Sequence, residues 1–120
     1  MKSQYCGVIA YGKRWRSQVS YRHKILNLGD WQSERTAAWV VDFAKFMLYG
    51  VNTEHWHHHA KKPNFLPTIR KKGVQGTEGD YIIQKLLDKS CLTPELAISR
   101  SADYDRVAQE IYSSHPQEVI

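Results

Sequence analysis

The sequence predicts an α+β fold, in which a three-stranded antiparallel sheet packs on one α-helix and a short helical extension follows. Three segments with the two-residue alternation of β-strands lie within residues 4–28, and strands so close in sequence pair as an antiparallel meander. One stretch with helical spacing follows directly, at residues 34–49. The chain of 120 residues is long enough for one domain with a hydrophobic core.

The middle strand, residues 14–21, has the clearest alternation. Trp15, Ser17 and Val19 share one face. The opposite face is polar and cationic, with Arg14, Arg16, Gln18 and Ser20. The first strand is expected at residues 4–10 and the third at residues 24–28, where Leu26 and Leu28 turn inward while Ile25 and Asn27 turn outward.

The helix predicted at residues 34–49 is apolar on two sides. Ser33 is a suitable N-cap, and Gly50 ends the pattern. One stripe consists of Ala37, Ala38, Val41, Ala44 and Leu48, and the other of Trp39, Phe43 and Phe46. Since the sheet covers only one stripe, the other must be covered by the C-terminal half of the chain or by another protein.

The chain divides into a sheet-and-helix domain at residues 4–67, a basic, glycine-containing linker at 68–79 and an acidic helical extension at 80–115. In the extension, Thr93 and Pro94 mark a helix start. Two roles are open for it. It folds back and buries its apolar side chains on the aromatic stripe, or it docks its amphipathic helices on a partner. The expected apolar side chains are Tyr81, Ile82, Ile83, Leu86 and Leu87.

Charge is unevenly distributed along the chain, whose net charge is +5. Residues 1–72 contain 13 Lys or Arg and 4 Asp or Glu, whereas residues 73–120 contain 4 and 8. A basic front half suits a phosphate-bearing partner, and the acidic tail does not. The charge distribution therefore favours nucleic acid as a partner of the front half.

An ordered set of short motifs spans roughly residues 4–67. It comprises Tyr5-Cys6-Gly7-Val8, Trp15, Leu28-Gly29-Asp30-Trp31, Glu34, Ala37-Ala38, Asp42, Ala44, Gly50 and Asn64-Phe65. The set resembles the AP2/ERF domain of plant transcription factors, including its Glu-x-x-Ala-Ala-x-x-x-Asp-x-Ala run and its closing Asn-Phe. The resemblance implies the same three-stranded sheet on one helix, with the sheet lying in the major groove of DNA.

The chain departs from the family at the positions that read bases. Cys6, Ile9, Ser20, Ile25 and Asn27 stand where the family carries arginines and a tryptophan. Because arginine is the commonest reader of guanine edges, we expect binding to double-stranded DNA with weak or altered sequence specificity. The expected DNA-binding residues are Arg14, Arg16, Gln18, Arg22, His23 and Lys24. The corresponding role is a nuclear, non-enzymatic module of a transcription or chromatin regulator.

An alternative hypothesis is a protein-interaction module that has lost base readout and acts as an adaptor in a nuclear chromatin or transcription complex. Its surface would be the apolar part of the sheet face or the aromatic face of the helix. The candidate residues are Ile9, Tyr11, Ile25, Trp39 and Phe43, with Phe46 beside the last two.

Other function classes have little support in the sequence. His55 and residues 57–59 form a histidine cluster, but adjacent histidines on one loop rarely supply a tetrahedral zinc site, so no metal and no cofactor are expected. No nucleophile elbow, phosphate-cradling loop or paired-carboxylate motif is present, so no enzyme is expected. No run of eighteen apolar residues occurs, and a membrane partner is not expected.

Overall fold

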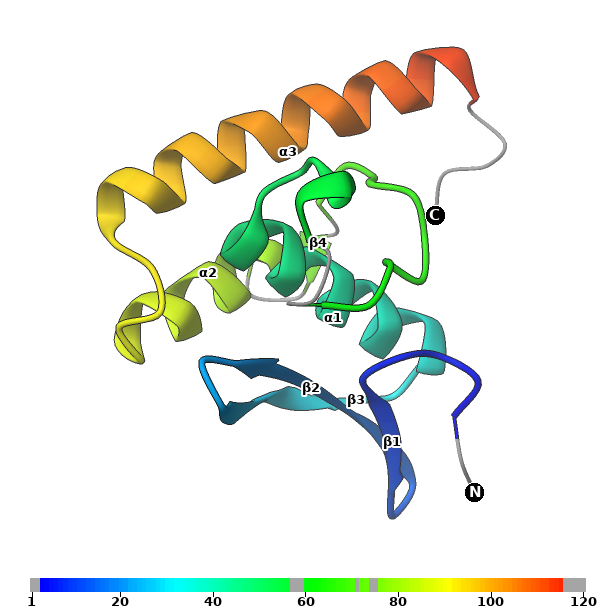
Figure 1. Ribbon diagram of the computed structural model, residues 1–120. Helices are drawn as coiled ribbons and strands as arrows, with labels where there is room; N and C mark the ends of the chain where they lie inside the picture. The colour runs from blue at the N-terminus through cyan, green and yellow to red at the C-terminus, as the bar shows by residue number, and fades with distance from the viewer. Residues whose placement is uncertain (1–2, 57–59, 71, 74–75, 116–120) are drawn as a thin grey trace.

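One helix lies at the centre of the molecule, between the sheet and the long C-terminal helix (Figure 1). The computed structural model describes residues 3–56, 60–70, 72–73 and 76–115. The predicted α+β class, with an antiparallel three-stranded sheet, is confirmed. The main elements are β1 (Val8–Tyr11), β2 (Arg14–Tyr21), β3 (Lys24–Trp31), α1 (Glu34–Tyr49), α2 (Glu78–Asp88) and α3 (Pro94–Ser114).

The bounds of β2 and α1 agree with the predicted ranges, and the other strands differ. β1 begins at Val8 rather than at residue 4, because Gly7 adopts a positive φ of 80° that ends extended pairing before it. β3 continues to Trp31 rather than ending at Leu28. Both hairpin turns occur where expected, at residues 12–13 and 22–23.

Local signals define both ends of α1. The Ser33 hydroxyl accepts a hydrogen bond from the Thr36 N–H at 3.3 Å, which satisfies one free donor of the first turn. At the other end Gly50 has a φ of 93°, and its N–H donates to the Phe46 carbonyl. Every residue from 37 to 48 is buried, so α1 is covered on both sides.

The sheet covers the alanine side of α1. Val8, Val19 and Leu28 are buried on the inner sheet face, and the fully buried Ser17 hydroxyl donates to the Ala37 carbonyl at 2.7 Å. The small side chains of Ala37 and its neighbour on the helix allow this close approach. The sheet therefore contacts the helix backbone directly, with a satisfied buried hydroxyl at the contact.

The C-terminal half of the chain covers the aromatic side of α1. Trp39 and Phe43 stack with centroids 5.2 Å apart, and Tyr104 of α3 meets Phe43 edge-on at 4.8 Å. Trp56 packs on Phe46 at 5.2 Å. Trp39 and Phe43 are 1% and 0% exposed, so the hypothesis that they form a partner-binding surface is wrong. The extension folds back, because these rings need a cover.

The side of α2 that faces the core differs from the expectation at Tyr81. Gly79, Ile82 and Leu86 face the core, whereas Tyr81 is 46% exposed. Gly79 lies close to α1 and to Arg70, since an added Cβ would be 3.2 Å from the Phe43 ring and 2.6 Å from the Arg70 side chain. Tyr81 instead meets Trp31 of β3 edge-on, at 6.0 Å between ring centroids.

The segment expected as a linker, residues 68–79, contains folded parts. Thr68 is buried, and its N–H donates to the Tyr104 hydroxyl. Arg70 forms ion pairs with Asp80 of α2 and Asp105 of α3 at 2.8 and 3.2 Å. Further along lie the short paired strands β4 (Lys72–Gly73) and β5 (Gly76–Thr77). The described part of this segment is thus attached to the extension that follows it.

A buried polar network ties α1 to the segment that closes the front half. The Asp42 carboxylate accepts hydrogen bonds from the N–H groups of Asn64 and Phe65, both at 2.8 Å. The Asn64 side chain in turn bonds both backbone groups of Cys6. Burial raises the pKa of Asp42 to about 6, although these hydrogen bonds and the Lys45 charge oppose the shift.

Candidate nucleic-acid interface

The strand register defines which residues lie side by side on the outer face of the sheet. Ile9 lies opposite Arg16, and Arg16 lies opposite Asp30, so these three residues form one row across the sheet. Tyr11 lies opposite Arg14. Toward the β2–β3 turn, the rows Gln18–Asn27 and Ser20–Ile25 follow. The predicted polar face of β2 is therefore a continuous surface that the helices leave uncovered.

The basic residues on this face lie along β2 and at both of its ends. Arg14 begins β2, beside Lys13 of the first turn, and Arg22, His23 and Lys24 follow its last residue. All five are exposed. The eight residues of β2 extend over about 24 Å at roughly 3.4 Å per residue. That length matches about seven base pairs of duplex DNA.

Arg16 is held by two neighbours on the outer face. Its Nε donates to Asp30 Oδ1 at 2.7 Å and its Nη2 to Asp30 Oδ2 at 3.1 Å. Its guanidinium lies 3.5 Å from the centroid of the Tyr11 ring. The hydrogen bond with Asp30 raises the pKa of Arg16, and the same contact lowers the pKa of Asp30. Arg16 is therefore fixed, unlike its exposed neighbour Arg14.

A β-bulge puts Asp30 on the outer face. Ser17 pairs with Gly29 while Gln18 pairs with Asn27, so Leu28 is an extra residue in β3. Strict alternation would turn Asp30 inward, since Leu26 and Leu28 are buried on the inner face. Gly29 adopts a φ of 115°, and its N–H is bonded by the Asn27 side chain. The bulge shifts the alternation by one residue and brings Asp30 opposite Arg16.

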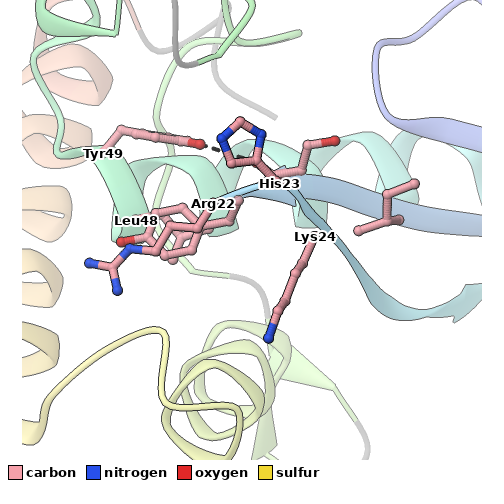
Figure 2. A pocket seen from close by; sticks show the side chains of 8 residues that line it. Arg22, His23, Lys24, Leu48 and Tyr49 are labelled. Atoms are coloured by element: carbon pink, nitrogen blue, oxygen red, sulfur yellow. Dashed lines mark hydrogen bonds between the residues drawn. The ribbon is translucent and has the colours of Figure 1, made fainter.

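The turn between β2 and β3 is formed by two left-handed residues. Arg22 and His23 have φ values of 51° and 65°, a conformation that hairpin turns usually fill with Asn and Gly. Figure 2 shows the Arg22 and Lys24 side chains extending to different sides of this turn. Arg22 and His23 thus place two large side chains where the backbone conformation favours small residues. The conformational free energy of such strained residues is often tolerated at functional sites.

A pocket of about 690 Å³ lies between this turn and the C-terminal end of α1 (Figure 2). Tyr49 and Leu48 form its α1 side, and the Tyr49 hydroxyl donates to the Ser20 carbonyl at 3.1 Å. Burial raises the pKa of Tyr49. The remaining lining residues are Tyr21, Arg22, His23, Lys24 and Ile25. Basic groups therefore border the pocket on its sheet side.

The apolar residues expected to form a protein-binding patch are not contiguous. Ile9, Tyr11 and Ile25 are 44%, 54% and 69% exposed. The register separates Ile25 from the other two by the row of Gln18 and Asn27. One side of the Tyr11 ring is occupied by Arg16. Large continuous apolar patches are typical of protein interfaces, and here polar rows interrupt the surface.

The acidic helix α3 lies away from this face. α3 is on the opposite side of α1 from the sheet (Figure 1), and its exposed residues include Glu95 and Glu110. Within residues 8–31, all of them described, Asp30 is the one carboxylate. The charge difference between the halves of the sequence therefore becomes a difference between two sides of the molecule, which would orient it toward a polyanion.

Asp30 and Lys13 are site residues that the sequence prediction did not include. Lys13 could have been found as a basic residue in the first turn. Asp30 could not be placed from alternation alone, and the signal for it is Gly29, a glycine within a strand that marks a bulge.

Among the described residues, no group of three or more His, Cys, Asp or Glu side chains is arranged to hold a metal ion. Residues 57–59 of the histidine cluster lie outside the described part of the chain. No described helix combines the length and the apolar character that crossing a membrane requires.

Comparison of the sequence with models of known protein families gave no match, and comparison with curated proteins gave none either. The AP2/ERF resemblance therefore rests on the motifs themselves and stays a prediction.

Proposed function

We propose that this chain is an AP2/ERF-like DNA-binding module of a nuclear transcription or chromatin regulator, which contacts duplex DNA through the outer face of its sheet. The observation that carries this proposal is the set of exposed basic side chains at both ends of β2, on a face that the helices leave open. Such groups bind phosphates, and the electrostatic attraction between basic side chains and phosphates dominates DNA affinity. A two-stranded ribbon such as β2–β3 fits the major groove.

The test is DNA binding as a function of salt concentration. Anisotropy of a labelled duplex would be followed from about 50 to 200 mM salt for the wild type, for Arg14→Ala/Lys24→Ala and for the control Arg106→Ala. Arg106 is an exposed cation of α3, on the other side of the molecule. The double variant should bind more weakly at every salt concentration, with a slope smaller by about 0.9 for each phosphate that is no longer neutralised.

Arg106→Ala should leave both the affinity and the slope nearly unchanged. No binding of the wild type near 50 mM salt would refute the proposal. A loss of affinity in Arg106→Ala that reaches half the loss in the double variant would refute the proposed face, because one removed charge against two would then account for the difference and the attraction would depend on net charge alone.

A second candidate function is the protein-interaction adaptor, which the exposure of Ile25 favours. Ile25 is 69% exposed beside the pocket of the β2–β3 turn. If the chain binds no DNA and a stoichiometric partner co-purifies with it, Ile25→Ser should release that partner. Release of the partner by Ile98→Ser instead would locate the interface on α3, where Ile98 is 73% exposed.

A further inference from the structure

We propose that Arg16, held in place by Asp30 and Tyr11, reads a guanine in the DNA major groove and is the residue that gives this sheet its sequence preference. This inference rests on the proposed DNA binding. Arg16 is not among the positions that the family resemblance marks for base reading. Its neighbours in the fold are what distinguish it from the other cations.

Some N–H groups of the Arg16 guanidinium are not bonded to Asp30. A guanidinium carries five N–H groups. Asp30 takes one on Nε and one on Nη2. Of the remaining three, one on Nη1 and one on Nη2 point along the edge that fits the O6 and N7 acceptors of guanine in a bidentate pair. Asp30 therefore occupies the side of Arg16 that a guanine does not need.

The second step is the charge of the pair. The Arg16 cation and the Asp30 carboxylate together carry no net charge, so the pair attracts phosphate less than the more exposed Arg14 does. A phosphate placed next to Arg16 would also lie near the Asp30 carboxylate and be repelled by it. A neutral base edge meets no such repulsion. The charge of the pair favours base contact for Arg16 and phosphate contact for the exposed cations at the ends of β2.

The third step is the position and fixation of the side chain. Arg16 lies on the middle strand, with Ile9 and Asp30 on either side of it. The Tyr11 ring at 3.5 Å and the two bonds to Asp30 fix the plane of the guanidinium before DNA arrives. Such preorganisation reduces the entropy that binding must remove, and it favours one binding geometry.

The fourth step is the bulge at Leu28, which makes the pair possible. Without it Asp30 would face the core. The positive φ of Gly29 and its bond from Asn27 maintain the bulge. Bulges commonly redirect a side chain at a functional position, and this one directs a carboxylate to the guanidinium of Arg16.

The experiment is selection of bound duplexes from a library with a randomised central segment, followed by sequencing. It would be run with the wild type, Arg16→Ala, Arg16→Lys, Asp30→Asn and the control Arg14→Ala. The wild type should enrich duplexes that share a guanine. In Arg16→Ala that enrichment should fall about tenfold, as expected when one bidentate pair is removed. Arg16→Lys should lose the guanine preference although it retains the positive charge, because lysine lacks the paired donors.

Asp30→Asn tests whether Asp30 orients the Arg16 guanidinium, or only changes the charge of the outer face, or only stabilises the sheet. It removes one negative charge from the face, so binding to random duplex should strengthen while the guanine preference falls. If the pair only holds two strands together, the melting temperature should drop and the preference should not change. Arg14→Ala should weaken binding to all duplexes alike and keep the preference.

Salt-dependent binding without any enriched guanine in the wild type would overturn the inference and leave the proposed DNA binding intact. An enriched guanine that persists in Arg16→Ala would overturn it as well. Failure of the wild type to bind any duplex would refute the inference and the proposed function together.

Discussion

The inner and outer faces of the sheet are made by the same three strands but meet different demands. The inner face packs on α1 through fully buried groups, among them Leu28 and Ser17. The outer face carries its charges in the open, and its Arg16–Asp30 pair is still partly exposed. Packing against α1 accounts for the fold, whereas the basic outer residues add little to it, because exposed ion pairs contribute about 0–1 kcal/mol. Stability and function are thus separable on this sheet.

The largest expected effect on stability is that of Phe43→Ala in α1, which tests whether core packing, rather than the outer face, stabilises the fold. Phe43 is fully buried between Trp39 and Tyr104. Its truncation should lower the free energy of unfolding by about 3–5 kcal/mol, because a cavity remains in the core. Urea unfolding followed by tryptophan fluorescence measures this. The control Tyr112→Ala removes a 46% exposed ring of α3 and should change stability by less than about 1 kcal/mol. Equal effects would mean that the C-terminal half does not share the core.

Asp42 on α1 and Asp30 on the outer face of the sheet should make contributions to stability that respond to pH in opposite directions. The buried Asp42 has a pKa raised to about 6, from the usual 3.8. The folded protein therefore binds this proton more tightly than the unfolded chain. Its contribution is fully present below about pH 4 and is lost as the pH rises through about 6. Stability should fall by roughly 3 kcal/mol over this window, since one pKa unit corresponds to about 1.4 kcal/mol.

Chemical unfolding at several pH values between 4 and 7 measures this change, and Asp42→Asn should flatten it. Asp30 on the outer face has a lowered pKa, so its contribution is present above 3.8 and is lost only at lower pH. Asp30→Asn should therefore leave the slope between pH 4 and 7 intact. A slope that survives Asp42→Asn would assign the titration to another group.

The elements of the fold could be predicted because their signals are local. The alternation in β2, the Ser33 cap and the Gly50 stop each depend on neighbouring residues only. The two-sided apolar pattern of α1 also showed that a second cover was required. The orientation of the C-terminal helices that cover α1 was predicted less well. The side of α2 that faces the core includes Gly79, which packs closely on Arg70 and on Phe43, and Phe43 lies in a distant segment of the chain.

The candidate site was predictable in part, for the same reason. Alternation along β2 places Arg14, Arg16 and Gln18 on one face, and the structure agrees. The partner of Arg16 depends on the register between β2 and β3. A single extra residue, Leu28, moves Asp30 from the inner face to the outer one. Whether a strand contains such a residue is decided by pairing across the sheet, which residue periodicity does not report.

Gly7 gives a smaller test of the inner face. It has a φ of 80°, and an added Cβ would lie 2.7 Å from both the Gln18 carbonyl oxygen and the Val41 side chain. Gly7→Ala should therefore destabilise the protein by about 2 kcal/mol or more. The matched control is Gly12→Ala in the outer turn, where φ is 62° and nothing lies within 4 Å. That control should cost about 1 kcal/mol, from backbone conformation alone. Thermal unfolding of both variants checks the difference.

The smallest expected effect should have the opposite sign, and it concerns the β2–β3 turn. Replacing Arg22 by Asn and His23 by Gly fits the left-handed conformation of both positions. Arg22→Asn/His23→Gly should therefore raise the free energy of unfolding by roughly 1 kcal/mol. The same change removes one cation from the proposed DNA-binding face, so the salt slope of DNA binding should decrease by up to about 0.9.

Both quantities can be measured on one preparation, by urea unfolding and by anisotropy of a labelled duplex. A gain in stability together with weaker DNA binding would show that Arg22 and His23 contribute to DNA binding while they lower the stability of the turn. Unchanged DNA binding would remove the turn from the interface and restrict it to the rows of Arg14 and Arg16. Lower stability would mean that interactions such as that of Arg22 with the Tyr21 ring, 5.1 Å away, outweigh the backbone cost.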